Sequence, residues 1–118
     1  MLTLRAAPGT DHLVELRNVP APVPAPNEAL VRVRASSLNA GEARYAQRAP
    51  TDWRPGSDVS GEVVRAAADG SGPGEGMRVV GLVQNGAWAE LAAVPTRWLA
   101  RIPDTVSYSD AATLPIAG

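Results

Sequence analysis

The sequence predicts a single, mainly β domain, and three observations support that fold class. The chain has 118 residues, 45% apolar and 19% charged, so it can build one hydrophobic core and is too apolar to stay disordered. Its 11 glycines and 11 prolines disfavour long helices. Between these breaks lie short runs of branched or alternating apolar residues, which is the pattern of β-strands.

The first third of the chain is expected to be extended. Residues 2–6 and 13–17 flank a Pro-Gly-Thr-Asp turn at 8–11 and predict a β-hairpin. The proline-rich run 19–26 must be extended, because proline lacks a backbone donor and moves the preceding residue out of the helical region. A third strand is predicted at 29–35, where every odd-numbered residue is alanine or valine and would form one dry face.

Helices are expected at two places. The first is predicted at 39–47, with Asn39 as its N-cap and Glu42 three residues later in a capping-box arrangement. The second begins after Ser107 as N-cap and runs toward Gly118, with Asp110 in its first turn. Because this last segment is apolar, we expect it to pack against a following part of the protein or against another chain.

The remaining strands are predicted at 59–67, 77–83, 87–94 and 98–102. An Asn-Gly pair at 85–86 between two β runs predicts that the second and third of these form a hairpin. The glycine-rich stretch 69–76 is interpreted as a turn rather than a phosphate loop. Its spacing does not match G-x-G-x-x-G, Pro73 interrupts it, and no long helix follows.

Composition excludes several classes of function. The chain has no cysteine and one histidine, His12, so disulfides, thiolate zinc sites and cysteine nucleophiles are excluded. The net charge of −1 is dispersed, which gives no basic surface for nucleic acid. No apolar run is long enough to span a bilayer, and the first residues lack a secretory signal pattern. We therefore expect a cytoplasmic protein.

Four sequence runs carry the remaining information. Taken singly, each is a turn beside a strand. The runs are RASSLN at 34–39, RPGSDVSGEV at 54–63, GMRVVG at 76–81 with NGAWAE at 85–90, and IPD at 102–104 with DAATLP at 110–115. As a set they resemble the N-terminal, GroES-like domain of the medium-chain dehydrogenase/reductase superfamily. The resemblance covers essentially the whole chain. It implies a partly open β-barrel with short helices, followed in whole members by a Rossmann domain, with NAD(P)H in the cleft between the two.

Departures from that family pattern place the chain in the zinc-independent quinone oxidoreductase-like branch. Zinc-dependent relatives carry cysteine at the position of Asn39, histidine at Ser57 and glutamate at Asp58. Neither asparagine nor serine is a usual zinc ligand. The cysteine-rich lobe that holds structural zinc in many relatives is also missing. We therefore expect no zinc.

The resemblance implies cofactor-binding positions at Asn39, Ala40 and Arg44. Quinone oxidoreductase-like members also carry asparagine at the Asn39 position, where the amide can fix a cofactor hydroxyl or a substrate carbonyl. The same asparagine can cap its helix. Ala40 and Arg44 stand where relatives often have proline and tyrosine, with Tyr45 one place later. Arg44 is either a phosphate ligand or a solvated helix residue.

The substrate cleft is expected to include Tyr45, Trp53, Ser57 and Asp58. Trp53 is either an aromatic wall for a flat substrate or a core side chain. Without the resemblance, Asp58 is a turn residue that can bond local backbone amides. No catalytic residue is assigned, since Tyr45 and solvent are equal alternatives as a proton donor.

The expected function is that of the substrate-side domain of an NAD(P)H-dependent oxidoreductase reducing quinones or α,β-unsaturated carbonyls. We predict a GroES-like domain at 1–105 and the start of a linker helix at 106–118. NADP(H) or NAD(H) would be held mainly by an absent Rossmann domain, so the chain alone is expected to be inactive. The expected partners include a second copy of the protein, with which it would form a homodimer.

Three alternatives stay open. The first is that the domain is a stand-alone binding or scaffolding module, and the second is that it is an enoyl-reductase domain of a larger synthase. The third is a zinc-type alcohol dehydrogenase relative that has lost its metal.

Overall fold

The computed structural model describes residues 1–116, which form a mainly β fold as predicted. The strands are β1 (Leu2–Ala6), β2 (Val14–Asn18), β3 (Glu28–Ala35), β4 (Asp58–Arg65), β5 (Arg78–Leu82), β6 (Leu91–Pro95) and β7 (Leu99–Arg101). The helices are α1 (Ala40–Tyr45) and α2 (Tyr108–Ala111), and the 3₁₀ turn η1 (Thr96–Trp98) precedes β7. Within 1–116, no helix has the length and apolar character needed to cross a membrane.

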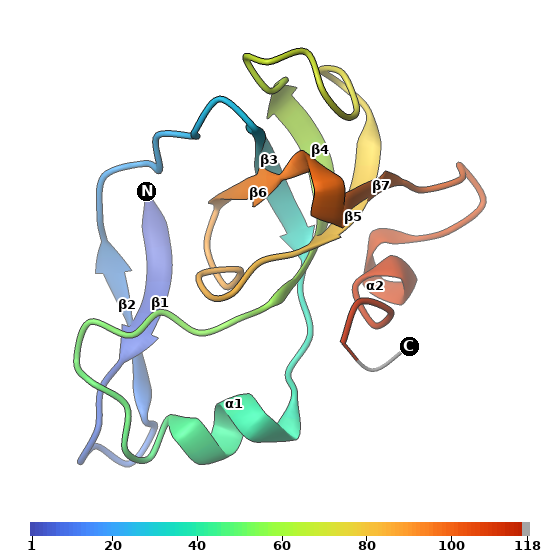
Figure 1. Ribbon diagram of the computed structural model, residues 1–118. Helices are drawn as coiled ribbons and strands as arrows, with labels where there is room; N and C mark the ends of the chain where they lie inside the picture. The colour runs from blue at the N-terminus through green and yellow to red at the C-terminus, as the bar shows by residue number, and fades with distance from the viewer. Residues whose placement is uncertain (117–118) are drawn as a thin grey trace.

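The strands form two antiparallel sheets. The predicted hairpin is confirmed, because β1 pairs with β2 and Leu2 lies opposite Asn18. The other five strands are arranged in the order β6-β3-β4-β5-β7 and curl into a partly open barrel (Figure 1). Its core is a layer of valines, each no more than 2% exposed, contributed by four strands: Val31, Val59, Val63, Val79 and Val94. Alternate residues of these strands face this layer, as a β-strand requires.

A glycine allows β3 and β4 to approach each other more closely than a side chain would permit. A Cβ at Gly61 would lie 1.9 Å from the carbonyl oxygen of Arg32. The register between the two strands shifts on either side of this point, between Leu30 and Val31 and between Val33 and Ala35. The close approach of the two backbones therefore requires glycine at position 61.

The N-terminal hairpin is attached to the barrel through β1. The backbone N–H of Leu4 donates to the carbonyl of Trp88 at 2.9 Å, and the N–H of Ala6 donates to the carbonyl of Trp53 at 2.8 Å. In the same ladder as the Leu4 bond, the N–H of Glu90 donates to the carbonyl of Leu2 at 3.1 Å. These bonds fix the positions of both tryptophan segments.

The predicted hairpin across Asn85-Gly86 is wrong. β6 pairs with β3, and β5 pairs with β4 and β7. The loop after β5 bonds instead to residues 54–57: Val83 donates to Ser57 at 2.8 Å, and Ala87 donates to Gly56 at 3.0 Å. The Asn-Gly signal correctly marks a tight bend, with φ +88° at Gly86, but the chain then crosses to the opposite edge of the sheet.

The prediction of a helix running from Ser107 toward Gly118 is also wrong in its length. Ser107 is the N-cap and accepts a bond from the N–H of Asp110 at 3.0 Å, but α2 ends at Ala111. The next amides bond three residues back instead of four, and Pro115 has no N–H to continue a helix. Residues 117 and 118 of the predicted helix lie outside the described residues.

The segment that contains α2 packs back onto the barrel. The hydroxyl of Ser60 donates to the carbonyl of Tyr108 at 2.6 Å. Arg78 donates to the carbonyls of Pro103 and Val106 at 2.9 and 2.7 Å, and its guanidinium lies 4.4 Å from the Tyr108 ring centroid. Residues 103–116 are therefore held against β4 and β5. Figure 1 shows α2 beside these strands.

Candidate functional site

The candidate site is centred on the side chain of Asp58, the first residue of β4, which is 0% exposed. One carboxylate oxygen accepts the hydroxyl of Ser37 and the side-chain amide of Asn39, the latter at 3.0 Å. The other oxygen accepts the backbone N–H of Ile116 at 2.9 Å. Three segments far apart in the sequence therefore meet at one carboxylate.

Asp58 is satisfied by neutral donors. The two ion pairs found within residues 1–116, Arg17–Glu15 and Arg34–Glu62, both lie away from it. A buried charge without a cation is tolerated only when its oxygens are well hydrogen-bonded. Bonds from N–H and O–H groups to a carboxylate are stronger than neutral ones, so the three donors together keep the charged group in place.

Asn39 has two structural tasks at this site. It is the N-cap of α1, and its backbone N–H donates to the Glu42 carboxylate at 3.2 Å within the predicted capping box, which is confirmed. Its side chain meanwhile donates to Asp58. A carboxylate only accepts hydrogen bonds, so the amide nitrogen rather than the amide oxygen must face it. The orientation of the Asn39 amide therefore follows from the chemistry of its partner.

The aromatic residues predicted for the cleft lie together. The rings of Tyr45 and Trp53 meet edge to face, with centroids 4.9 Å apart and planes at 83°. The guanidinium of Arg48 lies 5.4 Å from the Tyr45 ring centroid. Both aromatic side chains are partly buried, so the pair joins the end of α1 to the segment before β4.

The other predicted positions are more loosely placed. Ala40 and Arg44 are exposed on α1, and Arg44 makes no ion pair within residues 1–116. Ser57 is partly buried next to Asp58, and its hydroxyl reaches the carbonyl of Gln84 only at 3.5 Å. The structure therefore brings Asn39 and Asp58 together, and separately Tyr45 and Trp53.

Trp88 supports the site but was not among the predicted site residues. Its indole N–H donates to the carbonyl of Ser37 at 3.1 Å. Its backbone lies against Gly56, where φ is +102° and a Cβ would lie 2.6 Å from Trp88 atoms. Ser37 and Ile116 were also missed. The hydroxyl in the run before Asn39 was an available signal for Ser37, whereas a backbone N–H such as that of Ile116 leaves no trace in the sequence.

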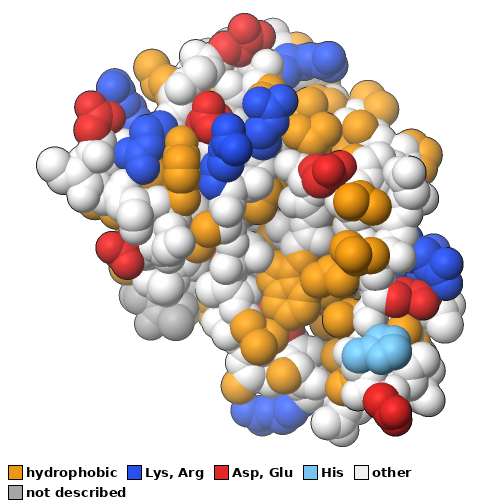
Figure 2. All heavy atoms as spheres, turned by 180° about the vertical axis from the view of Figure 1, so that it is seen from behind, with side chains coloured by type: hydrophobic (Ala, Val, Ile, Leu, Met, Phe, Trp, Pro, Cys, Tyr) orange, Lys and Arg blue, Asp and Glu red, His pale blue; other side chains and the backbone are white. Residues whose placement is uncertain are grey.

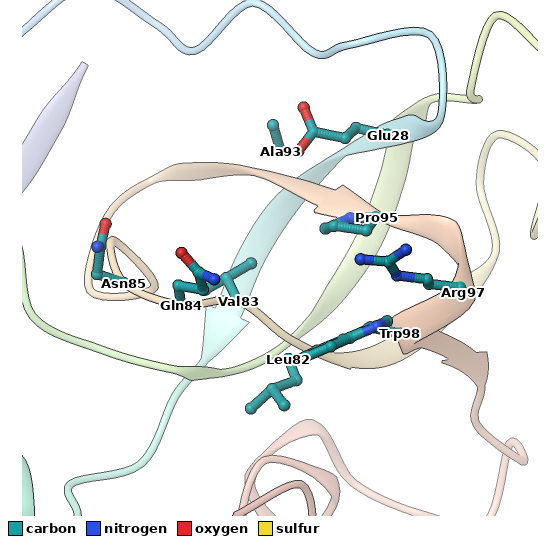
Figure 3. Close-up of a pocket in the computed structure, with 9 residues that line it drawn as sticks. All are labelled: Glu28, Leu82, Val83, Gln84, Asn85, Ala93, Pro95, Arg97 and Trp98. Atoms are coloured by element: carbon teal, nitrogen blue, oxygen red, sulfur yellow. The ribbon is translucent and has the colours of Figure 1, made fainter.

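Two surface hollows flank this centre without including Asn39 or Asp58. A hollow of about 260 Å³ is lined by nine residues, among them Gln84 and Asn85 (Figure 3). On its far wall Arg97 and Trp98 lie side by side, with the guanidinium 5.7 Å from the indole ring centroid. Within residues 1–116, no three His, Asp or Glu side chains are grouped so as to hold a metal ion.

The second hollow, of about 540 Å³, is largely apolar. Its lining includes Leu2, Leu16, Leu38 and Trp88, together with Ser37 of the candidate site. Figure 2 shows apolar side chains gathered on the rear face, on the side where the β1–β2 hairpin lies. The three leucines are 46%, 66% and 65% exposed. This face therefore presents a sizeable apolar surface next to the site.

The fold and the site together define a GroES-like β domain. A family model described as "Alcohol dehydrogenase GroES-like domain" matches residues 25–104, and the chain belongs to this family. The predicted resemblance to the GroES-like domain of the medium-chain dehydrogenase/reductase superfamily, with quinone oxidoreductase-like relatives, is confirmed.

Individual relatives agree with this assignment. Quinone oxidoreductase-like protein 2 of Rattus norvegicus is 34% identical, over 83% of this chain and 29% of that protein. Trans-enoyl reductase apdC of Emericella nidulans is 38% identical, over 81% of this chain and 33% of that protein. The solved quinone oxidoreductase of Thermus thermophilus, described also in complex with NADPH, is 29% identical with a TM-score of 0.80, covering 98% of this chain and 37% of that one. The chain spans about a third of the length of these proteins.

Proposed function

We propose that this chain is the substrate-side domain of a zinc-independent, NAD(P)H-dependent oxidoreductase that reduces quinones or α,β-unsaturated carbonyl compounds. The observation that carries the proposal is the pairing of Asn39 with buried Asp58 at the start of α1. Relatives named as quinone oxidoreductases and trans-enoyl reductases support both substrate classes. We further propose that the protein is cytoplasmic and that the whole protein forms a homodimer.

The side chains around α1 fit one edge of a nicotinamide nucleotide. The amide nitrogen of Asn39 is bonded to Asp58, and its carbonyl oxygen, which faces the backbone N–H of Glu42 in the capping box, has a second lone pair for a cofactor hydroxyl. Arg44, exposed at the end of α1, is suited to a phosphate group. Asn39 is not in the lining of either hollow described above, and we propose that a Rossmann domain is the main holder of the cofactor.

The chemistry asked of this chain is modest. When bound, the nicotinamide would supply the hydride, and the domain would orient the acceptor and exclude water. The edge-to-face pair of Tyr45 and Trp53 offers an apolar, rigid boundary for a flat acceptor. The Tyr45 hydroxyl and solvent are both suitable proton donors, and neither is assigned.

Zinc-independence rests on the donor set. Asn39 and Ser57 offer an amide and a hydroxyl, which bind zinc poorly compared with thiolate or imidazole. Treatment with a chelator is therefore expected to leave activity unchanged.

A titration with NADPH tests the proposal. We compare the 118-residue chain with a form extended past Gly118 along its own reading frame, following the cofactor fluorescence. The extended form is expected to bind NADPH and the short form to bind it weakly or not at all. Tight binding by the short form would show that the site is not split between two domains.

A binding or scaffolding module is the second candidate function, and the exposed Leu2, Leu16 and Leu38 favour it. Exposed apolar patches of this kind often mark interaction surfaces. Size-exclusion chromatography with light scattering on the 118-residue chain tests this second candidate. Concentration-dependent association that disappears in Leu16→Glu favours the module, and a monomer at all concentrations counts against it.

A further inference from the structure

We propose that Asp58 is a positioning residue that fixes the amide of Asn39 and ties it to the C-terminal segment at Ile116, so that the two move as one unit. This proposal deepens the proposed function, because the role of Asn39 in the cleft rests on that function. The linkage itself rests only on the geometry of residues 36–60 and 108–116.

The two oxygens of Asp58 serve different segments. The oxygen that holds Ser37 and Asn39 serves the loop between β3 and α1, whereas the other, within residues 1–116, accepts only the N–H of Ile116. Because the carboxylate is rigid, rotation that improves one set of bonds disturbs the other. A displacement of the C-terminal segment is thus transmitted to the Asn39 side chain through a single group.

Strand β4 keeps the Asp58 carboxylate in place. Asp58 lies opposite Leu82 in the β4–β5 ladder, and the residues that follow it, Val59 and Ser60, are both 0% exposed. Ser60 is two positions along, on the same face of β4, and its hydroxyl holds the carbonyl of Tyr108 at 2.6 Å. β4 therefore holds the C-terminal segment at two places, at Tyr108 through Ser60 and at Ile116 through Asp58. Of these two contacts, the one at Asp58 also belongs to the candidate site.

Because the Asp58 carboxylate is buried, its position depends on each of its hydrogen-bond donors. The carboxylate has no cation beside it within residues 1–116, so loss of one donor leaves part of a buried charge unsatisfied. Loss of the carboxylate removes the acceptor of the Asn39 amide nitrogen, so that only the capping-box contact of the Asn39 side chain with the backbone N–H of Glu42 still orients the amide.

Ser60→Ala provides a matched control for Asp58→Asn. Ser60→Ala removes the side-chain bond from β4 to Tyr108, whereas Asp58→Asn leaves a single oxygen that can accept from Ile116 or from Asn39 but not from both, so only Asp58→Asn touches Asn39. The readouts are the side-chain amide signals of Asn39 and the hydrogen exchange of the Ile116 N–H, followed by NMR on the 118-residue chain. Neither readout requires bound cofactor.

In Asp58→Asn we expect the Asn39 side-chain signals to shift and the Ile116 N–H to exchange at least about tenfold faster, because the one oxygen of the new amide cannot accept from both Asn39 and Ile116, and neither bond is then made to a charged group. In Ser60→Ala the Asn39 signals are expected to stay in place. If Asp58→Asn leaves both readouts unchanged, or Ser60→Ala moves the Asn39 signals equally, the proposal is wrong.

The double variant Asn39→Asp with Asp58→Asn separates positioning from general stability. The new amide at 58 donates to the new carboxylate at 39 and to Ser37, while its oxygen still accepts from Ile116. Protection of Ile116 is expected to return to within about twofold of wild type, a difference well below the tenfold change expected for a lost charged bond. Failure to recover would overturn the linkage. Should Asp58→Asn not fold, Ser37→Ala removes one donor and must still shift the Asn39 signals.

The extended form connects this proposal with the proposed function. Asn39→Ala and Asp58→Asn are expected to weaken NADPH binding non-additively, because both act through one amide. Ser60→Ala is not expected to weaken NADPH binding. Additive losses would overturn the positioning role. If wild type itself does not bind NADPH, the proposed function fails, and the exchange and NMR readouts still decide the linkage.

Discussion

The indole N–H of Trp88 donates to the backbone carbonyl of Ser37 at 3.1 Å, and Ser37 in turn donates its hydroxyl to Asp58. A residue of the loop after β5 thereby holds the residue that leads into Asn39. The same tryptophan backbone donates to the carbonyl of Pro55 at 3.2 Å. Trp88 therefore joins the two loops between which the candidate site is built.

Trp88→Phe is expected to lower the free energy of unfolding by about 1 kcal/mol, because an aromatic side chain is kept while the indole N–H that bonds to Ser37 is lost. Chemical denaturation measures the change. Trp98→Phe is the matched control, since Trp98 is 43% exposed and its indole has no such bond within residues 1–116, and its effect should stay within about 0.5 kcal/mol. Equal effects of the two changes would contradict the supporting role of Trp88.

Gly56→Ala is expected to destabilise the fold by at least about 2 kcal/mol, since φ is +102° and the added Cβ meets Trp88 at 2.6 Å. Gly41→Ala in α1 has open space around it and is expected to be neutral or to stabilise by up to about 1 kcal/mol. Thermal unfolding of both variants checks the pair. A tolerated alanine at 56 would show that the loops are not closely packed there.

Arg44→Ala is expected to weaken NADPH binding by the extended form about tenfold if the guanidinium holds a phosphate. Arg48→Ala is the control, because Arg48 lies over the Tyr45 ring and is expected to leave the affinity nearly unchanged. Cofactor titrations at two salt concentrations measure both. Unchanged affinity in Arg44→Ala would identify it as a solvated helix residue.

Local sequence signals predicted the elements better than their pairing. The hairpin of β1 and β2 and the N-caps Asn39 and Ser107 follow from residues close together in the chain. The Asn85-Gly86 bend was also found, but its partner, residues 54–57, lies some thirty residues earlier, and the loop signal contains no information about it.

The site was predictable only in part, for a similar reason. Asn39 and Asp58 were named as candidate residues through a family resemblance, and the structure adds the hydrogen bond between them. Ser37 and Ile116 were missed because their contributions come from a common hydroxyl and a backbone N–H. Helix α2 was predicted too long because the effect of Pro115 on the preceding turn was not weighed.

The most direct test of the central claim is NADPH oxidation by the extended form, with a naphthoquinone and an α,β-unsaturated ketone as acceptors and a chelator present. We predict turnover with at least one acceptor, resistance to the chelator, and strong loss of rate in Asn39→Ala. Turnover abolished by the chelator, or a rate independent of Asn39, would contradict the account.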